Sequence, residues 1–103
     1  MRIIELSQHA QTRLAEITGY YLIHESIERT LKVIDSFEEA FLKICENPFI
    51  HKKYISHEFT ALDIRIYLHY KTFHIYFVIY PASIKIAEIF HLKRNPGRVD
   101  VKL

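Results

Sequence analysis

The second half of the chain carries three apolar stretches with the pattern of β-strands. They span residues 64–70, 73–80 and 84–92. Apolar and polar residues alternate in the first stretch and at the start of the third, which is typical of strands with one buried face. The middle stretch is apolar on both faces after His74, which is typical of a central strand. Because the links between the stretches are very short, we expect neighbouring strands to pair antiparallel.

The first of these stretches has two faces of different character. Its apolar face consists of Ile64, Ile66 and Leu68. Its other face is basic and aromatic and consists of Arg65, Tyr67 and His69. More cations follow at His91, Lys93 and Arg94. Two interpretations stay open for these residues. They form either a solvated polar face or a site for phosphate or an acidic partner, since the Arg guanidinium binds both anions through two parallel bonds.

The first half predicts a short strand and two helices. Residues 2–6 are apolar and β-branched, and Ser7 is a good N-cap for a helix with an apolar stripe. Ser26 is the next N-cap. The stripe that follows it consists of Ile27, Leu31, Ile34, Phe37, Phe41 and Ile44. Asn47 and Pro48 end this helix. We expect a loop at 49–62, and the tail at 97–103 stays open between a frayed end and a short strand.

These elements predict an α+β fold of two layers, a helical hairpin packed on a small antiparallel sheet in the order β-α-α-β-β-β. The first strand joins an edge of the sheet beside a long neighbour. At 103 residues the chain is expected to be one domain, 1–103. With one cysteine, Cys45, no leader-like segment and no long apolar run, we expect a cytoplasmic protein that is not in a membrane.

The chemistry suggested by residue types is limited. The chain has only two glycines, so it has no glycine-rich phosphate loop, and a single cysteine cannot make a zinc pair. The seven histidines are scattered, and none pairs with another at i,i+4. Hydrogen-bonded or surface histidines are the more common arrangement, so we expect no metal and no cofactor.

The order of these segments resembles the RelE/ParE family of toxins from bacterial type II toxin–antitoxin modules. The residues that carry the resemblance are Ala10-x-x-x-Leu14, the run 37–48 ending in Glu46-Asn47-Pro48, the Ile64-Arg65 strand start, the strand 73–79 and the segment 86–96 with its His91-x-x-Arg94. The two Asn-Pro endings resemble the ParE branch most. The resemblance implies a toxin with two helices on an antiparallel sheet that is neutralised by an antitoxin segment wrapped around it.

Two activities occur in this family. RelE-like members cleave mRNA within the ribosome without metal, whereas ParE-like members inhibit DNA gyrase and lack most of the nuclease residues. By resemblance, Arg65 and Arg94 match basic positions of the nuclease branch. Tyr67 replaces an expected Lys, His74 an expected Arg, and Asp100 an expected Tyr. Losing a Lys and a Tyr removes charge stabilisation and an acid–base group, which favours the gyrase branch.

The sequence thus predicts a ParE-like toxin of the plasmid-stabilisation type, which inhibits a cellular target, DNA gyrase, and is held by a cognate antitoxin. We expect target or antitoxin contacts at Arg65, Tyr67, His91, Lys93 and Arg94. One alternative is a metal-independent endoribonuclease acting on mRNA in the ribosome, with Arg65, His74 and Arg94 stabilising the phosphate. Another is an inactive member that only binds antitoxin. A homodimer and a toxin–antitoxin hetero-oligomer both stay open.

Overall fold

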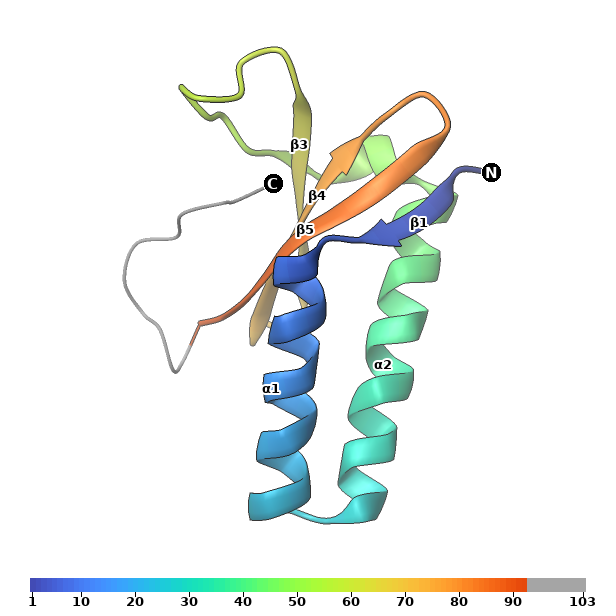
Figure 1. The fold of residues 1–103 in the computed structure, drawn as a ribbon. Helices are drawn as coiled ribbons and strands as arrows, with labels where there is room; N and C mark the ends of the chain where they lie inside the picture. The colour runs from blue at the N-terminus through green and yellow to red at the C-terminus, as the bar shows by residue number, and fades with distance from the viewer. Residues whose placement is uncertain (93–103) are drawn as a thin grey trace.

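Two helices lie side by side on one face of a five-stranded sheet in the computed structural model, which describes residues 1–92 (Figure 1). The elements in chain order are β1 (Ile3–Leu6), α1 (Gln8–His24), α2 (Ile27–Glu46), the 3₁₀ turn η1 (Pro48–Ile50), β2 (Lys52–Lys53), β3 (Asp63–His69), β4 (Phe73–Ile79) and β5 (Ser83–His91). The predicted two-layer α+β fold is confirmed. Lys93, Arg94, Asp100 and the tail at 97–103 lie outside the described residues.

The strands lie in the order β1-β5-β4-β3-β2. The three long strands pair antiparallel, as their short links require. β1 joins the edge beside β5, as expected, but it pairs parallel, so the sheet is mixed and not purely antiparallel. Both helices and three strands intervene between β1 and β5, and no tight turn therefore dictates their direction. The segment expected to be a loop contributes η1 and the two-residue β2.

Both helices begin at the predicted caps. The Ser7 hydroxyl accepts a hydrogen bond from the Ala10 amide at 3.0 Å, and the Ser26 hydroxyl accepts one from the Arg29 amide at 3.1 Å. A serine at this position satisfies one of the amides that have no partner within the helix. Each helix start is therefore marked by a cap that acts within three residues, and the Ser7 hydroxyl also donates to the Ala87 carbonyl oxygen of β5 at 2.8 Å.

The apolar stripe predicted for α2 is only half correct. Phe37 and Ile44 are buried against the sheet, but Ile27 is 70% exposed and Leu31 57% exposed. The reason is visible in Figure 1, where the hairpin end of the two helices extends beyond the strands. The first turns of α2 have no sheet beneath them, so an apolar pattern there does not lead to burial.

The sheet is covered on both faces. One cluster of buried residues joins the helices to β4 and β5. A second lies on the opposite face, where Tyr54, Phe59 and Leu62 pack on Ile64 and Val78. The helix layer therefore lies against the Tyr67 and His69 face of β3. A period of two defines two faces but does not say which of them meets the helices.

Candidate functional site

Arg65 is the centre of an internal network. Its Nε and Nη2 donate to the Asp63 carboxylate at 2.8 and 3.3 Å. Its Nη1 donates to the carbonyl oxygens of Phe49 at 2.8 Å and His51 at 3.0 Å. Only 12% of the Arg65 side chain is exposed, and its guanidinium fastens the segment of η1 and β2 onto β3. Arg65 therefore already has internal acceptors, and its contact with a target or antitoxin stays a prediction.

Tyr67 lies on the same face of β3 as Arg65 and packs against His51. The centroid of the His51 ring is 5.1 Å from that of Tyr67 and 5.8 Å from that of Phe77. Nε2 of His51 is buried and has no hydrogen-bond partner within residues 1–92. Burial, and then the positive charge of Arg65, lower the pKa of His51. We infer that this imidazole is neutral at pH 7 and acts as a packing group.

A hollow of about 530 Å³, the edge groove, opens beside Tyr67 at the β2 edge of the sheet. Its walls include His51, Lys52, Ile66, Tyr67, Leu68 and His74. β2 pairs only with Arg65 and Ile66, so within the described chain no strand pairs with β3 from Tyr67 onward on this side. Such a free strand edge is able to pair with an extended peptide. The edge groove therefore combines unpaired backbone with aromatic, apolar and basic side chains.

His74 and Arg65 do not converge. Cross-strand partners lie on the same face of a sheet, and β4 pairs His74 with Leu68 but Phe77 with Arg65. Leu68 and Arg65 are three residues apart in β3, so they and their partners point to opposite faces. Burial and the charge of Lys52 lower the pKa of His74. The cationic cluster expected for a nuclease is therefore not assembled by these two residues.

His91 ends β5, opposite Phe73, and the two ring centroids are 4.8 Å apart. Phe73 belongs to the core on the helix side of the sheet, so His91 lies at the margin of that core. Lys93 and Arg94, predicted to act with His91, lie outside residues 1–92. Of the five predicted contact residues, the structure thus brings Arg65 and Tyr67 onto one strand face and places His91 two strands away.

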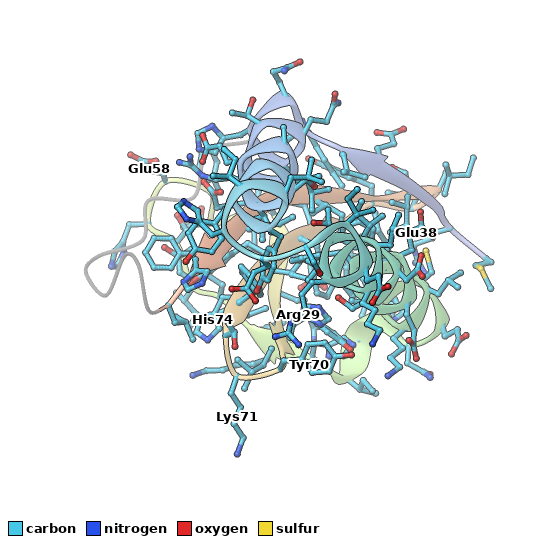
Figure 2. The ribbon with its side chains drawn as sticks, turned by 90° about the horizontal axis from the view of Figure 1, so that it is seen from below. Arg29, Glu38, Glu58, Tyr70, Lys71 and His74 are labelled. Carbon is cyan, nitrogen blue, oxygen red and sulfur yellow. The ribbon has the colours of Figure 1, made fainter. Side chains whose placement is uncertain are left out.

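A second concave surface, the helix groove, lies between α1 and α2. Its volume is about 370 Å³, and its walls include the apolar residues Leu6, Leu14, Ile17, Val33, Phe37 and Phe41. Thr18 and Glu38 are the polar residues along it. Figure 2 looks along the helices from their hairpin end and shows Glu38 on the outer side of α2. An apolar groove between two helices is a common seat for apolar side chains of a partner peptide.

Sequence reasoning missed a buried acid. Only 4% of the Glu88 side chain is exposed, and its carboxylate lies 2.7 Å from Nε2 of His9 and 3.2 Å from Nε of Arg13. The Ile89 amide also donates to it at 2.9 Å. An irregular register opposite Tyr76 turns Glu88 toward α1. An acid within the apolar run 84–90 was the available signal, because buried carboxylates need partners.

The described chain carries few signs of a cofactor. Within residues 1–92, no group of three or more His, Cys, Asp or Glu side chains is arranged to hold a metal ion. Neither described helix has the length and apolar character needed to cross a membrane.

Cys45 is half-buried, its Sγ lies 3.4 Å from the Arg2 carbonyl oxygen, and burial raises its thiol pKa. These features give Cys45 a packing role and not the character of an activated nucleophile.

Comparison with known proteins identifies the fold but no sequence family. No protein family model matches the chain, and no curated protein matches it. Among solved structures, a chain of the "Chromosomal ParDE TA system from P. aeruginosa" superposes with a TM-score of 0.71 at 17% sequence identity. The match covers 88% of this chain and 96% of that one. The chain therefore has the RelE/ParE-like α+β fold that the sequence resemblance predicts, the fold found in that ParDE toxin–antitoxin system.

Proposed function

We propose that this protein is the toxin of a type II toxin–antitoxin module and belongs to the ParE-like branch. The observation that carries the proposal is the match in fold over most of both chains with a structure of a ParDE system. The order of sequence motifs supports the same family. In this proposal the protein acts in the bacterial cytoplasm, binds DNA gyrase and is held inactive by a cognate antitoxin, as in modules that stabilise plasmids.

The two grooves suggest how an antitoxin binds. The helix groove offers an apolar seat between α1 and α2, and the edge groove offers unpaired backbone along β3. An antitoxin segment with apolar residues at helical spacing fits the first, and an extended segment fits the second. Lys52 lines the edge groove and favours acidic side chains in the extended segment.

The nuclease alternative is weakened by the positions of its residues. Arg65 is hydrogen-bonded internally, and His74 faces the opposite side of the sheet. Phosphoryl chemistry without a metal needs several cations around one phosphate. We therefore favour inhibition of a target by binding over cleavage of mRNA, and we retain the inactive antitoxin binder as the outcome if no toxicity is found.

Induced expression in a bacterial host tests the proposal. A ParE-like toxin arrests growth and relaxes plasmid supercoiling while mRNA stays intact, and co-expression of the antitoxin restores growth. Cleavage of mRNA with normal supercoiling would establish the nuclease instead. Unimpaired growth with full expression of folded protein would leave only the inactive binder.

A matched pair of variants tests the helix groove. Thr18→Arg places a long charged side chain in the groove, whereas Thr12→Arg makes the same change on the exposed surface of α1. We expect Thr18→Arg to lower antitoxin affinity by roughly tenfold or more, since a long charged side chain fills the apolar groove and must lose water on binding. Thr12→Arg should keep the parental affinity. Equal affinities of both variants would exclude the helix groove as the docking site.

A further inference from the structure

A separate hollow, the turn pocket, lies between α2 and the turn that joins β3 to β4. Its volume is about 320 Å³, near the lower limit for small-molecule sites. Arg29 and Lys32 from α2 line one side, and His69, Tyr70 and Thr72 from the turn line the other. Figure 2 shows Arg29 and Tyr70 together at this end of the molecule. None of these five residues lines either groove assigned to the antitoxin, and Val33 lines both the turn pocket and the helix groove.

The two cations of the turn pocket have little internal compensation. Arg29 and Lys32 are three residues apart in α2 and therefore share one face of the helix. Nε of Arg29 lies 3.8 Å from the Glu25 carboxylate, and both side chains are largely exposed, so this ion pair is loose. Among residues 1–92, no carboxylate lies within ion-pair distance of Lys32. Both cations are therefore available to an anionic ligand.

The turn holds an exposed aromatic ring at the pocket in an unfavourable backbone conformation. Tyr70 has φ 53° and Lys71 has φ 58°, and the Thr72 amide donates to the His69 carbonyl at 3.0 Å. Turns with two positive φ angles favour Asn and Gly at these positions. Tyr70 is 73% exposed, whereas Lys71 points away from the pocket (Figure 2). Strained residues of this kind concentrate at functional sites.

His69 gives Tyr70 a rigid base. The two ring centroids are 4.4 Å apart with a tilt of 38°. His69 is buried, and its Nε2 lies 3.0 Å from the Ser36 hydroxyl. That hydroxyl donates its proton to the Val33 carbonyl oxygen at 2.7 Å, so Nε2 must donate to Ser36. The hydrogen bond orients the imidazole, and the largely exposed Tyr70 ring lies against it at a tilt while lining the pocket.

We propose that the turn pocket binds a nucleoside phosphate, with the base stacked on Tyr70 and the phosphate held by Arg29 and Lys32. Aromatic side chains stack on bases of any type, and Arg and Lys are the usual cations for phosphate. A plain anion would leave the Tyr70 ring unused, and an apolar ligand would leave two cations unpaired. A free mononucleotide and the 5′ end of a single strand share this chemistry. The proposal goes beyond the toxin function and does not depend on it.

Binding is measured on the purified full chain by calorimetry and by NMR of the amides around the turn. The probes are adenosine monophosphate, adenosine and inorganic phosphate at one ionic strength. We expect the monophosphate to bind about tenfold or more tightly than either part alone, with the largest shifts at Tyr70 and Lys32. A 5′-phosphorylated tetranucleotide then distinguishes the sources. Tighter binding than the monophosphate indicates a strand end, and equal binding indicates a free nucleotide.

Variants distinguish a loss of the binding site from the effect of net charge and from a loss of folding. Arg29→Gln with Lys32→Gln should weaken monophosphate binding at least about tenfold, whereas Lys53→Gln with Lys85→Gln makes the same change in net charge and should not. Tyr70→Asn with Lys71→Gly relaxes the turn and should fold well, but it should lose the preference for the monophosphate over phosphate. Equal loss in both charge variants, or a monophosphate that binds no better than phosphate, would overturn the proposal.

Discussion

Two arginines show how differently the two ends of the molecule are built. Arg65 lies on a strand of the sheet, is 12% exposed and donates hydrogen bonds to Asp63 and to two carbonyl oxygens. Arg29 lies on the protruding end of the helical hairpin, is 62% exposed and has one loose acidic neighbour. The first arginine holds the fold together, and the second is available to a ligand. This accessible arginine lies where the helices extend beyond the sheet.

The strongest test of this contrast is removal of each arginine. Arg65→Ala leaves the Asp63 carboxylate and two carbonyl oxygens without their donor, and we expect it to lower the free energy of unfolding by about 3 kcal/mol. Arg29→Ala should change it by less than about 1 kcal/mol. Urea denaturation of both variants measures the difference. Similar losses would show that Arg65 is not the structural arginine.

The next largest effect is expected at Glu88. Its carboxylate joins β5 to His9 and Arg13 of α1, so Glu88→Gln should lower the free energy of unfolding by about 2 kcal/mol. Glu16 also contacts Arg13 but is largely exposed, and Glu16→Gln should change stability by less than about 0.5 kcal/mol. Thermal unfolding of the two variants compares them. Equal midpoints would mean that the buried carboxylate contributes nothing beyond a neutral amide.

Relaxing the turn between β3 and β4 should raise stability, whereas the two previous changes lower it. Tyr70→Asn with Lys71→Gly removes two unfavourable positive φ angles and should raise the free energy of unfolding by about 1 kcal/mol. Thr60→Asn with Ala61→Gly, in an exposed part of the segment before β3, serves as the control and should give no such gain. A loss of stability in the turn variant would show that the Tyr70 ring packs more tightly than its exposure suggests.

The smallest effect is a dependence of stability on pH. Burial is the main cause of the lowered pKa of His51 and of His69. Near the ordinary histidine pKa of about 6.5 the unfolded chain therefore binds more protons than the folded one. Stability is retained above that pH and falls as the pH decreases through the folded-state pKa values. Urea titrations between pH 8 and 5 should show this slope, and His69→Gln should reduce it.

Features set by neighbouring residues could be predicted from the sequence, whereas contacts between distant segments could not. Ser7 and Ser26 predict the helix starts correctly because a cap acts within three residues. The strand order from β3 to β5 follows from links too short for any other pairing. The structural role of Arg65 could not be predicted, because the carbonyl oxygens of Phe49 and His51 reach its guanidinium only once the η1 segment lies against β3. Glu88 was missed because its partners lie some 75 residues earlier in the chain.

The most direct test of the proposed function is a supercoiling assay with purified DNA gyrase and this protein. We expect the protein to inhibit supercoiling in a dose-dependent way and stoichiometric antitoxin to reverse the inhibition. Folded Arg65→Lys protein should keep inhibitory activity, since this side chain serves the fold and not the target. Full gyrase activity at a large excess of folded protein would contradict the proposed function.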